Sequence, residues 1–196
     1  MAWAKNGTPS TLTGAADVIT ISDLTAKKFN VILLHDFPAN ANNIRELVRF
    51  NNNTNSVYAY RLSEAGAADL TYINQPEINY GMSASSEFHV SYVCSITGQE
   101  KLMIDFGAST QTTGAGNAPL RREQVGKFVP SPDAGITRVD ITNTDTGDYA
   151  IGTNLSALGT TGDEVFYNIQ NGTVFEETDT NKSFIFNSST GAWTQF

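Results

Sequence analysis

The sequence predicts an all-β protein: an antiparallel β-sandwich of jelly-roll-like form, followed by a small C-terminal β-hairpin module. Three observations predict it. Short apolar or alternating runs recur between turn residues, hardly any segment has helical periodicity, and Thr, Asn, Ser and Gly are abundant. Charged residues make up only 16% of the chain, against about 25% in an average globular protein. Short strands at this spacing are typical of sandwiches and barrels.

The clearest predicted strands lie in the first two thirds of the chain. Residues 29–35 form a mostly apolar run that suits a central strand. Residues 87–94 alternate, with apolar side chains at the even positions, and residues 101–106 are expected to face them across the turn at 96–99. Two such runs joined by a short turn predict a hairpin.

Two further expectations concern the segment between these strands. Residues 46–50 and 57–62 are separated by the turn-rich tract 51–56, which predicts a second hairpin. Residues 41–49 contain the one weak helical candidate, a single turn. The Gly- and Thr-rich tract 107–118 is expected to be a long exposed loop.

The pattern divides the chain into three parts. We expect an N-terminal arm over residues 1–16, the sandwich over 17–159 and the small module over 160–196. In the module, candidate strands at 165–167, 174–177, 183–186 and 192–196 alternate with turns, so hairpins are the economical interpretation. Isolated hairpins are marginal in water, and we therefore expect this module to pack on another surface.

Length and cysteine content indicate a core without covalent or metal support. A chain of 196 residues that folds compactly buries roughly 70% of its unfolded surface. Cys94 is the single cysteine, so no internal disulfide can form, and its apolar run predicts a buried, inert thiol. These features favour folding in a reducing cytoplasm, and we expect no cofactor.

The charge balance excludes two classes of partner. The net charge is −8, whereas binding to a nucleic-acid backbone or an anionic membrane requires clustered Lys and Arg. The first residues lack a basic region followed by an apolar one, and no apolar run approaches 18 residues. We therefore expect no signal peptide and no transmembrane helix.

No set of residues marks an active site, and we expect the chain not to be an enzyme. His35 and His89 each lie in an apolar run without metal-ligand spacing, which predicts structural roles. The acidic tracts 143–148 and 177–181 offer oxygens for calcium, but Asx-rich turns have the same composition. A glycan-cleaving pair of carboxylates is the weakest of the functional hypotheses, because nothing marks a particular pair.

Aromatic residues suggest two kinds of contact. Tyr58 and Tyr60 alternate along one strand and could stack on a sugar, although such residues more often belong to a core. This possibility supports an alternative function, a lectin-like module that binds a host surface glycan. Trp3, Trp193 and Phe196 lie near the chain ends and are candidates for subunit contacts.

The tail combines a Thr-Asp-Thr turn, an aromatic strand, a Gly and a Trp, within residues 172–186 and at 192–193. Further characteristic segments of the body are 48–53, 58–61, 100–102, 114–123 and 126–128. These segments resemble structural proteins in the virions of tailed phages, and the tail is similar to a short module of such proteins. The resemblance implies a virion component, either a head decoration (cement) protein or a tail component, made in the host cytoplasm. It also implies a homo-oligomer that contacts other virion proteins, and it transfers no catalytic residue.

Overall fold

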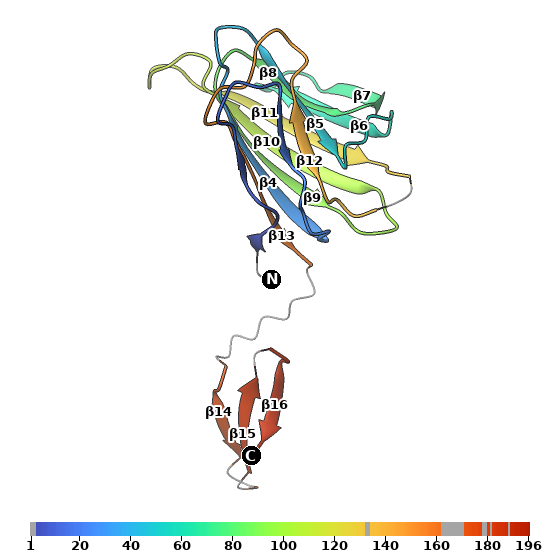
Figure 1. Cartoon of the computed structure of the whole chain (residues 1–196), viewed down its shortest axis with the longest axis vertical. Helices are drawn as coiled ribbons and strands as arrows, with labels where there is room; N and C mark the ends of the chain where they lie inside the picture. The colour runs from blue at the N-terminus through green and yellow to red at the C-terminus, as the bar shows by residue number, and fades with distance from the viewer. Residues whose placement is uncertain (1–2, 132–133, 162–170, 178–179, 181, 188) are drawn as a thin grey trace. The chain divides into compact units, whose positions relative to one another are not determined.

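The computed structural model describes residues 3–131, 134–161, 171–177, 180, 182–187 and 189–196. The chain divides into two compact units, with the boundary after Thr161. The main unit spans Trp3–Thr161, and the small unit holds the C-terminal strands (Figure 1). This boundary lies two residues beyond the expected end of the sandwich.

The described residues form sixteen β-strands and no helix, so the all-β class is confirmed. A nine-stranded antiparallel sheet has the order β1-β13-β4-β9-β10-β11-β6-β7, with β2 also paired to β13. Its strands are β1 (Ala4–Lys5), β2 (Ser10–Thr11), β4 (Phe29–Asp36), β6 (Tyr58–Glu64), β7 (Leu70–Gln75), β9 (Glu87–Cys94), β10 (Lys101–Ser109), β11 (Leu120–Phe128) and β13 (Asn154–Thr160).

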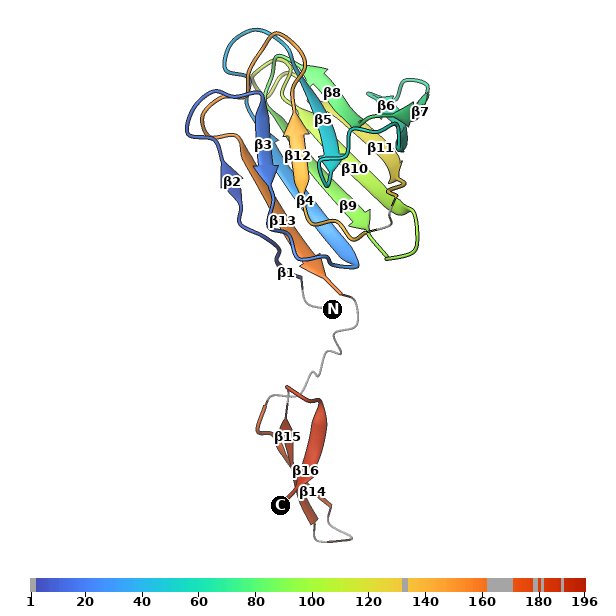
Figure 2. The same cartoon turned by 45° about the vertical axis from the view of Figure 1, so that its right-hand side comes forward.

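A second sheet has four strands in the order β3-β12-β5-β8. It lies across one face of the large sheet, and the two layers make a β-sandwich (Figure 2). The finer expectation, jelly-roll connectivity, stays a prediction. In the part of the chain that the structure describes, no helix is long and apolar enough to span a bilayer. The strands of the second sheet are β3 (Val18–Ile21), β5 (Ile44–Phe50), β8 (Ile78–Ser83) and β12 (Val139–Thr142).

One predicted hairpin is confirmed and the other is wrong. Strands β9 and β10 pair in antiparallel register, with Met103 opposite Val93. Strands β5 and β6 were expected to pair, but β5 pairs with β12 and β8, whereas β6 pairs with β11 and β7. The tract 51–56 therefore carries the chain from one sheet to the other. The helical turn expected within 41–49 is also wrong, because most of that segment is strand β5.

Residues 3–16 of the segment expected to be a separate arm belong to the main unit. Strand β1 pairs with β13 through Ala4 and Gly159, and β2 pairs with the same strand through Thr11 and Asn154. These short strands therefore extend the large sheet along β13. The exposed loop expected from residue 107 begins at residue 110, because β10 continues to Ser109.

The small unit is a three-stranded antiparallel sheet in chain order, made of β14 (Val174–Glu177), β15 (Lys182–Asn187) and β16 (Ala192–Gln195). Two hairpin connections join these strands, as the turns at 179–182 and 188–191 predict. The further strand expected at 165–167 lies outside the described residues.

The hydrophobic core lies between the two sheets of the main unit. Phe128 and Tyr58 of the large sheet stack with ring centroids 4.8 Å apart, and Phe50 of the small sheet packs 5.7 Å from Phe128. The hydroxyl of Tyr58 accepts a hydrogen bond from the Phe50 amide at 2.9 Å and lies 3.2 Å from the Phe50 carbonyl, to which it can donate. This side chain therefore links the two layers through a polar contact inside an apolar core.

Substitution of Tyr58 by Phe should lower the free energy of unfolding by about 1–3 kcal/mol, because the buried Phe50 amide loses its acceptor. Urea denaturation of Tyr58→Phe measures the loss. Tyr92→Phe is the matched control, since the Tyr92 side chain is half exposed and should leave stability within about 0.5 kcal/mol of the parent. Equal stability of the two variants would contradict the role given to the Tyr58 hydroxyl.

Candidate functional site: an apolar sheet face over a buried ionic cluster

The central strands β9 and β10 have an inverted pattern of burial. In β10 the side chains of Lys101, Met103, Asp105 and Ser109 are buried, while those between them are exposed. In β9, likewise, the odd positions are buried. The apolar residues at the even positions, which would ordinarily face a core, thus point away from the second sheet. The polar residues face inward.

The outward side chains form a continuous apolar surface, here called the outer apolar face. Cross-strand pairs connect it, because Leu33 is opposite Val90, Val90 is opposite Phe106, and Ile104 is opposite both Tyr92 and Val125. Six of its members are 46–56% exposed, and the other two, Leu33 and Val90, are partly buried. The face consists of Leu33, Phe88, Val90, Tyr92, Leu102, Ile104, Phe106 and Val125.

Beneath this face the inward side chains form a buried ionic cluster around His89. The His89 ring is fully buried, with Nδ1 at 3.0 Å from Asp105 Oδ2 and Nε2 at 3.1 Å from Glu87 Oε2. Both nitrogens can donate only when the ring is protonated. Burial alone would lower the pKa of His89, but the hydrogen bonds to Asp105 and Glu87 outweigh it and raise the pKa to about 10. The ring is therefore an imidazolium at neutral pH.

Arg122 supplies the second cation of the cluster. Its Nη1 donates to Glu87 Oε2, its Nε donates to Glu64 Oε2 at 3.0 Å, and its Nη2 donates to the Met82 carbonyl at 3.0 Å. Burial would raise the pKa of Glu87, but the hydrogen bond from His89 and the charge of Arg122 lower it below the usual value of 4.5. Glu87 is therefore ionised, and His89 and Arg122 both contact its Oε2 atom.

Neighbouring side chains complete the polar shell. The Tyr80 ring from β8 stacks on the His89 ring at a centroid distance of 4.7 Å. The Tyr80 hydroxyl also forms a hydrogen bond with Ser91, whose hydroxyl in turn donates to Asp105 Oδ1 at 2.7 Å. The cluster thus joins the second sheet to the large one.

Two glycines provide the space that the cluster needs. A β-carbon at Gly107 would collide with the His89 ring, and one at Gly81 would collide with the Arg122 guanidinium. The His89 ring therefore approaches the backbone of the adjacent strand β10, and the Arg122 guanidinium approaches that of β8 in the second sheet. This close approach requires glycine at each position.

Two further carboxyl groups, Asp36 and Glu46, are fully buried beside the cluster. Burial and the charge of Glu87 raise the pKa of Asp36 from 3.8 to about 7. Burial, followed by the charges of Glu87 and Asp36, raises the pKa of Glu46 well above 4.5. Neither carboxyl oxygen of Glu46 has a hydrogen-bond partner among the described residues. In mildly acidic solution both groups keep their protons, so the paired ions of the cluster are the charged groups.

The arrangement has the properties of a structural cluster. All six ionisable side chains, Asp36, Glu46, Glu87, His89, Asp105 and Arg122, are at most 3% exposed. A reactant in solution therefore has no open route to them. Within the described residues, no group of three or more His, Cys, Asp or Glu side chains could hold a metal ion.

The candidate glycan contacts and the candidate subunit contacts chosen from the sequence differ in burial. Tyr58 and Tyr60 are buried and stack on Phe128 and Tyr72, so these rings offer no free face to a glycan, and the core interpretation is the correct one. Trp3, Trp193 and Phe196 are exposed. Their role in subunit contacts stays a prediction.

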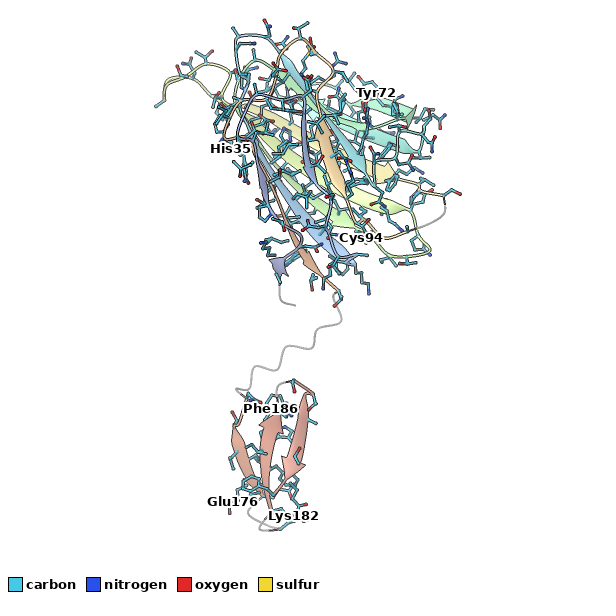
Figure 3. The ribbon with its side chains drawn as sticks, viewed as in Figure 1. His35, Tyr72, Cys94, Glu176, Lys182 and Phe186 are labelled. Carbon is cyan, nitrogen blue, oxygen red and sulfur yellow. The ribbon has the colours of Figure 1, made fainter. Side chains whose placement is uncertain are left out.

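Three other expectations are resolved by burial and contacts. His89 is buried as expected, but His35 is exposed on the outer side of β4. Cys94 is a free, half-buried thiol rather than a buried one, and it lies opposite Leu102. His35 and Cys94 mark two separate positions on the main unit (Figure 3). In the acidic tract 143–148, Asn143 Oδ1 accepts from the amides of Arg45 and Asp145, the arrangement of an Asx turn.

Sequence reasoning missed the ionic cluster and the outer apolar face. Their signal was present in the alternation of residues 87–94 and 101–106, where Glu87, His89, Ser91 and Asp105 occupy one side and large apolar residues the other. Two paired strands with charged residues on the same side indicate either a solvated face or a buried ionic network. The sequence alone does not decide which side faces the second sheet.

Comparisons with protein-family models, with curated proteins and with solved structures found no match. The functional argument therefore depends on the geometry of the chain itself.

The buried groups predict that stability is greatest in mildly acidic solution and falls as pH rises. The raised pKa values mean that folded Asp36 and Glu46 retain protons that the unfolded chain has released. For Asp36 the free energy of unfolding therefore falls between about pH 4 and pH 7, and Glu46 acts in the same direction above its usual pKa of 4.5. The raised pKa of His89 adds to the free energy of unfolding in full below pH 6.5, and this addition is lost as the pH rises through about 10. The lowered pKa of Glu87 acts in the opposite direction, since its contribution is lost as pH falls below 4.5.

Urea denaturation at about pH 5, 7 and 9 measures this dependence. Asp36→Asn is the informative variant, because the amide oxygen can still accept from the Glu87 amide that Asp36 Oδ1 now binds at 3.1 Å. It should flatten the slope between about pH 5 and 7. Stability that increases from pH 5 to pH 9 would contradict the assignment.

Removal of the Arg122 charge should be costly because it leaves Glu87 buried without its guanidinium partner. We expect Arg122→Met to lower the free energy of unfolding by about 3–5 kcal/mol. The double variant Glu87→Gln/Arg122→Met should regain part of that loss, since the amide oxygen still accepts from His89. Arg121→Met is the matched control: Arg121 is the exposed neighbour, so the change should be within about 0.5 kcal/mol. If Arg122→Met lowered the free energy of unfolding no more than Arg121→Met does, the ion pair between Arg122 and Glu87 would be refuted.

Proposed function

We propose that this chain is a structural protein of a tailed-phage or viral particle, a head decoration (cement) or tail component that acts by assembling with further copies of itself. The observation that supports assembly is the outer apolar face. The resemblance of the tail and of several body segments to virion proteins supports the kind of particle.

The size of the outer apolar face is consistent with a stable interface. Its six half-exposed side chains, at about 150–200 Å² each, leave about 450–600 Å² open. A standard protein interface buries about 800 Å² on each partner, apolar core and polar rim together, and an apolar patch of a few hundred Å² on a soluble protein is often functional. Covering the face would release this area from water, which is the main driving force for association.

The distribution of charge favours a second copy of the same sheet as the occupant. The centre of the face, on β9 and β10, has no charged side chain, while β11 and β6 bring Arg121, Glu123, Arg61 and Lys127 to one side of it. Both signs occur at this rim, so two copies related by a two-fold axis can place opposite charges together. Sheets that pack face to face through apolar side chains are common in β proteins.

Self-association can be measured directly. Sedimentation velocity of the full chain should show a defined oligomer, and Ile104→Asp should convert it to a monomer, because a carboxylate at the centre of the face would have to be buried without a partner. Ile151→Asp is the matched control, since Ile151 is exposed in a turn outside the strands that form this face, and it should leave the oligomer intact.

A strictly monomeric parent would refute assembly through this face. The particle assignment has a separate test, mass spectrometry of purified particles from the source, which should detect this chain at a defined copy number. An oligomer that is absent from particles would retain the self-association and overturn the virion role.

A further inference from the structure

The three-stranded sheet of the small unit presents an aromatic face. Phe175 of β14 is opposite Phe184 of β15, and Phe186 is opposite Trp193 of β16, so all four rings lie on one side. Phe175 packs 6.1 Å from Trp193 in an edge-to-face arrangement, and Phe186 lies 5.2 Å from Trp193. Phe186 is buried, but Phe175 and Trp193 are open to solvent.

A hollow of about 360 Å³ lies over the open part of this face. Its lining consists of Phe175, Phe184, Trp193 and Glu177, that is, three aromatic rings and one carboxylate. Glu177 ends β14 beside Lys182 of β15, at the opposite end of the sheet from Phe186 (Figure 3). This volume is in the range of small-ligand sites, about 300–1,000 Å³.

We propose that this hollow binds a neutral oligosaccharide. The apolar C–H face of a pyranose ring packs on an aromatic ring, and the hydroxyl groups at the edge of the sugar donate to a carboxylate such as Glu177. The lining matches this chemistry because it is aromatic rather than aliphatic and has an anionic acceptor at its border. The hollow belongs to the small unit, whereas the outer apolar face belongs to the main unit.

Charge and geometry narrow the class of ligand. Glu177 borders the hollow and the chain has a net charge of −8, so sialylated or other anionic sugars would be repelled. A peptide that extends the sheet would pair with the backbone of an edge strand and has no need of the rings. A neutral pyranose therefore fits the hollow better than either alternative.

The full chain with Trp3→Phe gives a direct readout. Trp3 and Trp193 are the two tryptophans of the chain, so in this variant the fluorescence reports on the hollow alone. The probe is an array of neutral and sialylated oligosaccharides, followed by fluorescence titration with the neutral member that binds most strongly. We expect saturable binding with a change in Trp193 emission.

Three variants in β14 test whether binding depends on the residues that line the hollow or on the small unit in general. Phe175→Ala should weaken binding by about tenfold or more, as for a central aromatic contact, and Glu177→Gln should also weaken it without removing apolar packing. Val174→Ala, on the opposite side of β14, should leave affinity unchanged. The proposal is overturned if no neutral oligosaccharide binds, if sialylated ones bind equally well, or if both Phe175→Ala and Glu177→Gln bind as the parent does.

Discussion

The ion pairs of His89 determine how the large sheet faces its partner layer. An imidazolium between Asp105 and Glu87, with Arg122 also paired to Glu87, is stable only where all these groups are enclosed together. The cluster therefore makes the side chains at the odd positions of β9 and β10 face the second sheet. Strand geometry then turns Phe88, Tyr92, Ile104 and Phe106 outward. The ionic cluster and the outer apolar face are thus two consequences of one register.

The buried ionic cluster specifies one strand register rather than simply adding stability. Replacement of a buried ionic network by apolar side chains is often neutral or stabilising, so the network has to be explained by what else it does. Here it aligns five strands, because Asp36, Glu46, Glu87, Asp105 and Arg122 come from β4, β5, β9, β10 and β11. A shift of one residue in β9 or β10 would expose the ions and bury the apolar residues.

The two units present different surfaces. The main unit has a broad, flat apolar face suited to another sheet, whereas the small unit has a hollow lined by aromatic rings. A three-stranded sheet of this size has little interior of its own, so its rings serve both as core and as surface. The assembly and the ligand binding that we propose therefore belong to different parts of one chain.

The sequence by itself determined the all-β class, the β9–β10 hairpin and the strands of the small module, because alternation and turn residues are local properties. It also identified the stretch around His89 as a strand. Only the tertiary structure decided that β5 and β6 belong to different sheets. A turn-rich tract can connect two strands of one hairpin or two strands of different sheets equally well. Likewise, alternation in β9 and β10 defines two sides but not which one faces inward. That choice depends on Arg122, Glu46 and Tyr80, which come from distant segments and meet His89 or Glu87 only when the sandwich is assembled.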